Sequence, residues 1–298
     1  MRVTFGSSYR NGLADITRTA EELARRQREV SSLQRMQVPS DDPSAMAAAI
    51  GERSEMRVYD QYLRATDSVG SRLDVIDSAL SDMLRNLTAA QSTAAASQAS
   101  FLTQAQRQAY ALQLGGIRDA ILSDLNIKYR DTYMFSGTAA DQAPYERNAA
   151  GVVQAYAGDH QQMAIDVART SSVEVTIDGS VIAQGSDPDD LFKVFDDLIT
   201  AVRAGDGTGI AAGMAGLDRA FERTTNAQSR VGNALRTIGD HKARLGDMRR
   251  ASDARRSTLE DANLAEAISG MQRADAAHQA AISAVAATSR LSLFDYLK

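Results

Sequence analysis

The sequence of 298 residues contains no cysteine, no tryptophan, only four prolines, and 5% aromatic residues. Without cysteine there is no disulfide, no thiolate metal ligand and no cysteine nucleophile. A compact globule of this length usually carries more large side chains to fill its core. Abundant alanine, leucine, arginine and glutamate with little proline instead favour long helices with narrow contacts.

Long apolar runs and an excess of positive charge are also missing. No segment approaches the roughly 18 consecutive apolar residues of a membrane span, so membrane insertion is not expected. The net charge of −5 argues against nucleic-acid binding, because no excess of basic residues is available for phosphates. The opening segment MRVTFGSSYRNGLADITRT lacks the apolar core of a cleaved signal peptide.

What the sequence does contain is apolar residues at alternating spacings of three and four, which predict paired long helices. Three such stripes stand out: Leu13, Ile16, Ala20, Leu23, Gln27 and Val30; Tyr62, Thr66, Val69, Leu73, Ile76, Leu80, Met83 and Leu87, continuing through Ala90, Ala94, Ser97 and Phe101; and Leu264, Ile268, Met271, Asp275, His278, Ile282 and Val285. Ala274, Ala277, Ala281 and Ala284 are expected to lie on the faces that flank the last stripe.

Shorter stripes complete the helical pattern. Thr103 resembles a helix cap before a stripe that includes Leu114 and Ile121. Residues 186–188, Ser-Asp-Pro, open a short helix with Leu191, Phe195, Leu198 and Val202 on one face. A regular stripe runs from Ile210 to Ile238.

Two breaks and one change of period interrupt the helices. VPSDDP at 38–43 predicts a loop in which Ser40 or Asp41 caps a helix and Pro43 lies in its first turn. GDGTG at 205–209 predicts a turn between helices. Between them YMFSGT, QMAIDV and VEVTIDGSVIAQG predict short strands, with a hairpin turn at Asp178-Gly179.

The residues predict no catalytic site, no metal site and no cofactor. His160, His241 and His278 are far apart and lack metal-ligand spacing. The acids at 187–190 fit the first turn of a helix better than a calcium loop.

The stretch from 281, AISAVAATSRLSLFDYLK, carries unusual apolar surface for the end of a helix. Two interpretations remain open: an ordinary two-helix pair with a frayed tail, or a helix bundle built between subunits that folds on assembly.

The heptad stripes flanking VPSDDPSAMAAAIGERSEMR, with the closing LEDANLAEAISGMQRADAAHQAAISAVAATSRLSLFDYL, resemble the flagellin superfamily. YMFSGTAADQAPYE and the ending SLFDYL are similar to the branch that forms the hook–filament junction. The resemblance implies a mainly α fold, with heptad helices from both chain ends forming a coiled-coil rod and a small inserted β domain. It further implies an inner domain of 1–38 and 262–298, a middle helical domain of 39–139 and 187–261, and an outer β domain of 140–186.

The resemblance also implies a function. The protein would be a structural, non-enzymatic part of the bacterial flagellum, outside the cell, exported through the flagellar type III channel without a cleaved signal peptide. Its partners would be further copies of itself in a helical ring, another hook-associated protein, flagellin, and a cytoplasmic export chaperone on the C-terminal helix. The expected assembly residues are Leu13, Ile16, Leu23, Val30, Leu264, Ile268, Met271, Ile282, Val285, Leu291, Leu293 and Phe294, with a spoke-like loop of Pro39, Ser40, Asp41, Asp42 and Pro43.

Other functions stay open at this point. The nearest is a flagellin that forms the filament itself. A non-flagellar coiled-coil adhesin, or a binding module formed by the β insert on a helical stalk, would also fit long helices around a short β segment.

Overall fold

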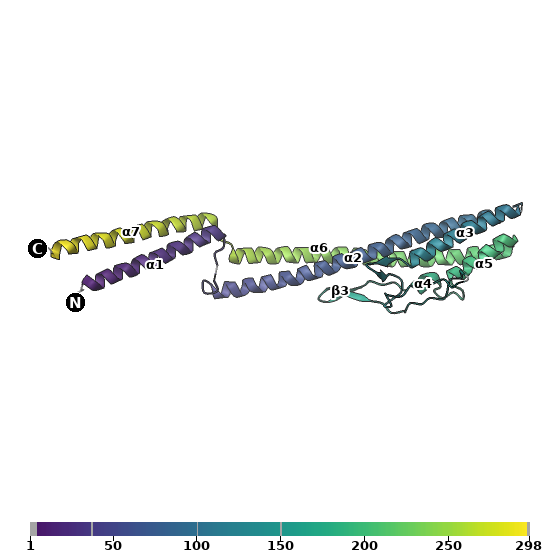
Figure 1. Cartoon of the computed structure of the whole chain (residues 1–298), viewed down its shortest axis with the longest axis horizontal. Helices are drawn as coiled ribbons and strands as arrows, with labels where there is room; N and C mark the ends of the chain where they lie inside the picture. The colour runs from purple at the N-terminus through teal and green to yellow at the C-terminus, as the bar shows by residue number, and fades with distance from the viewer. Residues whose placement is uncertain (1–4, 37, 100, 150, 297–298) are drawn as a thin grey trace. The chain divides into compact units, whose positions relative to one another are not determined.

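The computed structural model describes residues 5–36, 38–99, 101–149 and 151–296, and among these the side chains between 10 and 287. Its helices are α1 (Phe5–Ser32), α2 (Pro43–Ser97), α3 (Gln104–Leu125), α4 (Gly179–Ala183), α5 (Leu191–Ala204), α6 (Gly207–Glu260) and α7 (Leu264–Tyr296). The strands are β1 (Lys128–Tyr129), β2 (Thr132–Tyr133), β3 (Ala164–Ala168) and β4 (Ser171–Glu174). The predicted fold class, mainly helical with pairs built from both chain ends and a small β insert, is confirmed (Figure 1).

The chain divides into two compact units. Residues 1–59 with 247–298 form the first unit, and residues 60–246 form the second. The predicted division into inner, middle and outer domains has different borders and stays a prediction.

In the first unit α1 and α7 form an antiparallel pair, drawn in purple and yellow in Figure 1. Gly12 lies against Val285, and the Thr19 hydroxyl is 3.1 Å from Nδ1 of His278. Arg26 lies beside Gly270 further along the pair. Residue numbers rise along α1 as they fall along α7, so the pair is antiparallel. The three contacts are spread from Gly12 to Arg26, so the pairing extends over most of α1.

The same unit holds the first turns of α2 and the last turns of α6. Arg255 on α6 donates to Glu52 on α2 at 2.7 Å. The link between α1 and α2 is fixed to the link between α6 and α7, since the Arg35 amide donates to the Glu260 carbonyl at 2.7 Å and the Ala262 amide to the Leu33 carbonyl at 2.9 Å. Both links are therefore part of the folded unit.

The second unit contains the main hydrophobic core. The predicted α2 stripe is buried, as are the apolar faces of α3, α5 and α6; its largest fully buried members include Leu73, Ile76, Leu80, Met83, Leu87, Leu114, Ile121, Leu125, Phe192 and Phe195. Across the pair of long helices, the Gln228 amide donates to the Ser81 hydroxyl at 2.8 Å. The prediction that Phe101 continues the α2 stripe is wrong: α2 ends at Ser97, and Phe101 is 85% exposed in the link to α3.

The β insert differs from the prediction. β3 and β4 form a hairpin that turns at 169–170, whereas residues 179–183 form the short helix α4. The expected turn at Asp178-Gly179 fails because Asp178 has a φ of −69° and its carboxylate accepts from the Ser180 amide, which starts a helix. Of the predicted strand 133–138, only Tyr133 belongs to a strand, β2, and Ser136 forms an isolated bridge to Asp178.

The helix ends follow cap chemistry closely. Thr103 forms a capping box with Gln106, as its sequence predicts. The short helix α5 is capped by Asp190, so it starts three residues after the predicted opening at 186–188. Gly205 ends α5 with a φ of 74°, which favours glycine. The turn predicted at 205–209 is confirmed but shorter, since α6 already begins at Gly207.

Candidate functional site

The contact between α1 and α7 is made mainly by small side chains of α7. Ala267 and Ala274 are buried there, while Met271, His278 and Val285 are half-buried. The prediction that four alanines flank the seam is therefore wrong for Ala274, which is buried in it, whereas Ala281 is half-buried at its edge and Ala277 and Ala284 are exposed. Small residues at Ala267 and Ala274 let the two helices approach closely at these positions.

Large apolar residues of α7 consequently lie outside the seam. Leu264, Ile268 and Ile282 are 49%, 37% and 46% exposed, and Leu13 on α1 is 44% exposed. At about 100° per residue, Ile282 lies roughly 50° from the middle of the α7 seam and Leu13 roughly 90° from that of α1, in the same rotational sense. In an antiparallel pair, offsets in the same rotational sense fall on the same side. We call these four residues the apolar side.

The opposite side of the pair is charged. Glu22 and Arg26 of α1 and Glu266 and Arg273 of α7 line a shallow hollow of about 450 Å³. Partial burial alone would raise the pKa of Glu22, but hydrogen bonds and charge from Arg25 and Arg26 outweigh it and lower that pKa. The pair thus presents two chemically different sides.

The first unit has little core of its own. Among its described side chains, the buried hydrophobic residues are Met36, Ala45, Ala49, Ala267 and Ala274. Only Met36 among them is large, so burial inside this unit removes little apolar area from water. Its larger apolar residues remain available for contacts with other molecules.

The structure places the predicted assembly residues in three groups. Ile16, Leu23, Val30, Met271 and Val285 are half-buried along the α1–α7 pair. Leu13, Leu264, Ile268 and Ile282 form the apolar side. Leu291, Leu293 and Phe294 belong to α7, but their side chains lie outside the described residues. The role of all of them in assembly stays a prediction.

The predicted spoke-like loop is an exposed turn before α2. Pro39 and Ser40 are at its tip, and the Val38 amide donates to the Asp41 carboxylate at 3.2 Å. The cap of α2 is Asp42 rather than Ser40 or Asp41, because the Asp42 carboxylate accepts from the Ala45 amide at 3.0 Å. Pro43 begins the helix, as predicted.

Hydrogen bonds at this cap also change the acidity of Asp42. The Ala45 amide, with a smaller contribution from the Ser44 hydroxyl, lowers the pKa of the Asp42 carboxyl. The ionised form, which is the form that caps a helix best, is therefore favoured.

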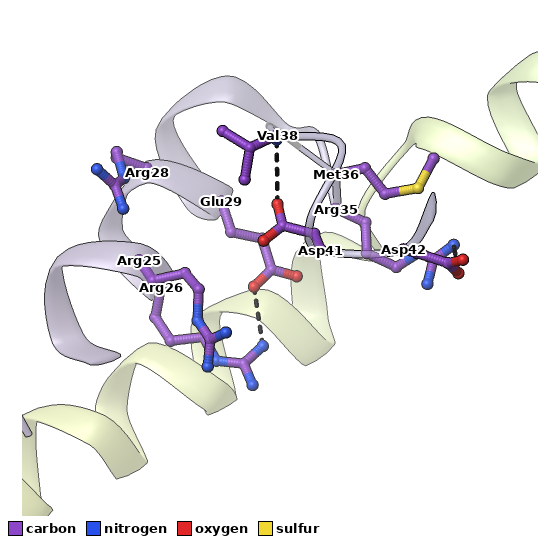
Figure 2. Close-up of a pocket in the computed structure, with 9 residues that line it drawn as sticks. All are labelled: Arg25, Arg26, Arg28, Glu29, Arg35, Met36, Val38, Asp41 and Asp42. Atoms are coloured by element: carbon purple, nitrogen blue, oxygen red, sulfur yellow. Dashed lines mark hydrogen bonds and ion pairs between the residues drawn. The ribbon is translucent and has the colours of Figure 1, made fainter. Parts of the chain in front are cut away.

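Next to this loop lies a pocket of about 290 Å³ (Figure 2). We call it the basic pocket, because four arginines line it, Arg25, Arg26, Arg28 and Arg35, beside three acids, Glu29, Asp41 and Asp42, and two apolar residues, Met36 and Val38. Arg26 pairs with Glu29 at 2.9 Å. Sequence reasoning missed this pocket, although the segment ARRQRE at 24–29 offered a signal.

The histidines hold structural positions. His278 lies in the α1–α7 seam beside Thr19, His241 is 3.0 Å from the Ser171 hydroxyl, and His160 pairs with Asp178 at 2.7 Å. Within the part of the chain that the structure describes, no cluster of three histidine, aspartate or glutamate side chains could hold a metal ion. No helix among those residues is long and apolar enough to cross a membrane.

Comparison with known proteins identifies relatives of this architecture. Residues 7–140 match the family described as the bacterial flagellin N-terminal helical region. Flagellar hook-associated protein 3 of Salmonella typhimurium is 24% identical over 216 residues, which are 68% of this chain and 67% of that protein. The protein of the same description from Escherichia coli is 23% identical over 257 residues, covering 83% and 79% respectively.

Solved structures share the fold. A putative flagellar hook-associated protein from Vibrio parahaemolyticus superposes with a TM-score of 0.61 at 20% identity, over 74% of this chain and 97% of that one. A flagellar junction protein from Legionella pneumophila superposes with a TM-score of 0.59 at 16% identity, over 72% of this chain and all of that one.

Proposed function

Because residues 7–140 match the bacterial flagellin N-terminal helical region, we propose that this protein is a structural, non-enzymatic subunit of the bacterial flagellum, at the junction between hook and filament. The names of its relatives as hook-associated protein 3 support the junction rather than the filament. The protein works outside the cell, in the flagellum.

One observation carries the mechanism: the first unit leaves four large apolar residues exposed together on one side of the α1–α7 pair and, among its described side chains, buries only one large apolar residue, Met36. Leu264, Ile268 and Ile282 lie along a single stripe of α7, with Leu13 beside them on α1. Contact with neighbouring subunits removes this stripe from water, at a gain of about 25 cal/mol for each Å² buried. Assembly thus completes a core that one chain cannot build.

The partners follow from this role. Copies of the chain contact each other along a helical ring, another hook-associated protein lies toward the hook, and flagellin lies toward the filament. Before export, a cytoplasmic chaperone covers the apolar face of α7. The contacts in a helical tube are head-to-tail, since such contacts repeat without closing on themselves.

The test replaces the apolar side by charge. We expect the double variant Ile268→Asp with Ile282→Asp to enter hook–filament complexes about tenfold less, or worse, for each molecule exported, because a carboxylate cannot be buried there unpaired. The measurement is the amount of protein in the culture medium and in purified complexes. Ala280→Asp, an exposed position on the other side of α7, is the matched control and is incorporated normally. Normal incorporation of the double variant would contradict the proposed mechanism.

The second candidate, a filament-forming flagellin, is supported by the family match alone, since that family is named for flagellin. The purified protein distinguishes the two when sheared filament fragments are added as seeds. A junction subunit does not elongate the seeds, whereas a flagellin elongates them into long filaments.

A further inference from the structure

A groove in the second unit lies between α6 and the segment 171–186, which contains β4 and α4. Both ends of the groove are held. At one end Nε2 of His241 is 3.0 Å from the Ser171 hydroxyl, and at the other Arg223 donates to two carbonyl groups of α4 at 3.0 Å. Between these contacts, residues of both walls line a hollow of about 610 Å³. We call it the β4 groove. Its volume falls in the range of about 300–1,000 Å³ that is usual for ligand pockets.

The floor of the β4 groove is apolar. Leu73 of α2, Val173 of β4 and Val231 of α6 line it and are buried. Two buried polar residues of the lining, Thr176 and Asp178, already have hydrogen bonds within the β insert. An occupant therefore needs apolar groups on the side that faces the floor.

The outer edge of β4 forms part of one wall. Three consecutive residues, 172–174, line the groove, although side chains along a strand alternate between its two faces. None of the described residues of β3 lines it. The groove therefore meets β4 at the edge that points away from β3.

The register of the hairpin shows which backbone groups are free at this edge. The Val175 amide donates to the Met163 carbonyl at 2.8 Å, which fixes the alternation along β4. Because residues of an antiparallel strand point alternately toward and away from the partner strand, Ser172 and Glu174 direct their amide and carbonyl groups away from β3. Within the described part of the chain these outward groups have no hydrogen-bond partner.

One cation of the groove also lacks a partner. Among the described residues, the charged side chains of the lining are Arg223, Arg230, Glu174 and Asp178. Arg223 is paired with Asp187, Asp178 with His160, and the Gln162 side-chain amide lies 2.9 Å from the Glu174 carboxylate. Arg230 is exposed on the α6 wall, and it has no ion pair or hydrogen bond within the part of the chain that the structure describes.

Arg72 of α2 adds a second cation beside β4. Its Nε donates to the carbonyl of Val175, the residue after β4, at 2.9 Å, and its Nη2 is buried without a hydrogen-bond partner. Within the described part of the chain neither Arg72 nor Arg230 has a carboxylate partner, whereas Glu174 is the one exposed acid of the lining. The charge around the groove therefore favours an occupant that carries a carboxylate.

We propose that the β4 groove binds an extended segment of another polypeptide, which pairs with the outer edge of β4 and places an acidic side chain beside Arg230. The outward groups of Ser172 and Glu174 supply the backbone hydrogen bonds of such an added strand. Alternate side chains of the segment point to the apolar floor. The α6 wall from Arg223 to Thr237 is about 21 Å long, which matches about six residues of strand.

The helix opposite β4 limits what can bind. An exposed strand edge usually invites pairing with other sheets, and proteins protect such edges by covering them. Here α6 forms the second wall, so a single extended segment fits, whereas a sheet of several strands is too wide. This inference goes beyond the proposed function and does not depend on it, since the groove lies wholly within residues 60–246.

A library of random seven-residue peptides displayed on phage, with the full-length protein as bait, tests the proposal. We expect the selected peptides to alternate apolar residues with others and to contain an acid. The commonest sequence, made as a synthetic peptide, should lose at least about fivefold in affinity when Arg230→Glu places like charges together. Isothermal titration calorimetry measures the affinity. Arg244→Glu is the matched control, because Arg244 is exposed on α6 outside the groove, and this variant binds the peptide like the unmodified protein.

Filling the groove is a second test. Ala234 is a half-buried residue of the lining, so we expect Ala234→Phe to occupy the space of the segment and to weaken peptide binding at least about tenfold. Ala243→Phe makes the same change at an exposed position of α6 outside the groove and leaves binding unchanged. Circular dichroism shows that both variants keep their helices.

Hydrogen exchange measured by NMR distinguishes an added strand from any other way of binding. We expect the peptide to slow exchange of the Ser172 and Glu174 amides at least about tenfold, because these amides gain acceptors. The Val173 amide already faces β3 and changes less. A library that yields no acidic peptide, or a peptide that binds without protecting these two amides, would overturn the inference. Either result leaves the proposed function intact, because incorporation of Ile268→Asp with Ile282→Asp tests that function separately.

Discussion

Asp42 decides where α2 begins. Its carboxylate accepts from the Ala45 amide at 3.0 Å and from the Ser44 hydroxyl at 2.8 Å, and Pro43 follows as the first helical residue. The sequence predicted a cap at this place but assigned it to Ser40 or Asp41. Two adjacent aspartates satisfy the same pattern, and only the backbone path, in which Asp41 binds the Val38 amide instead, separates them.

We expect Asp42→Ala to speed amide hydrogen exchange at Ala45 about fivefold, because the amide loses its acceptor. Hydrogen exchange measured by NMR, residue by residue, gives the result. Ser40→Ala is the control: Ser40 is exposed and close in sequence, and its hydroxyl makes no hydrogen bond within the described part of the chain. If the two variants exchange alike, the cap assignment is wrong.

At the scale of elements, the heptad spacing predicted the long helices of the second unit well. The residues spaced from Val69 to Leu87 on α2 are large, and burying them against α3 and α6 is the dominant gain, so pattern and packing agree. The β insert was harder to predict from the sequence, because Asp178-Gly179 fits a hairpin turn and a helix start equally well. The choice depends on Phe135, whose carbonyl accepts from the Gly179 amide at 2.9 Å.

In the terminal pair the same spacing rule was right only in part: Met271, His278 and Val285 lie in the α7 seam, whereas Leu264, Ile268 and Ile282 lie beside it. Ala267, Ala274 and Ala281 each lie one position before a residue of the predicted stripe, a rotation of about 100°. Hydrophobicity favours the larger residues, whereas close approach of two helices favours the smaller ones. If the larger residues bind other molecules, they are not needed in the seam within one chain, so a rule based on hydrophobicity alone cannot place them.

A larger side chain in the seam is therefore expected to weaken the α1–α7 pair. Ala274→Leu introduces a larger side chain at a buried position of the α7 seam, at a cost of about 1–3 kcal/mol. The weaker pair is measured in two ways: the helical circular dichroism signal is lost at a lower temperature, and amide hydrogen exchange in α1 becomes faster. Ala277→Leu, at an exposed position of the same helix, makes the same change in size and leaves the pair intact. Equal effects of the two would return Ala274 to the flank of the seam.

On the scale of the whole molecule, the two units differ in how they are stabilised. The cluster of buried side chains from Val69 to Ile238 lies entirely within residues 60–246. The first unit depends on ion pairs, on backbone hydrogen bonds between its two links, and on a narrow helix pair. We infer that only the second unit is stable by itself.

A fragment of residues 60–246 is accordingly expected to fold alone. It should unfold in one cooperative transition, because its core needs no residue from the other unit. Thermal unfolding followed by circular dichroism, compared with the full chain, measures this. A fragment without a cooperative transition would show that the second unit depends on the ends of α2 and α6 that belong to the first.

The antiparallel pairing of α1 with α7 has a consequence for timing. Gly12 meets Val285 only after nearly the whole chain between them has been delivered, whether from the ribosome or through a narrow channel. Three of the four residues of the apolar side belong to α7. In the proposed assembly, a product that stops short of α7 would therefore have neither a partner for α1 nor a surface for its neighbours, so defective copies would be excluded without any separate proofreading.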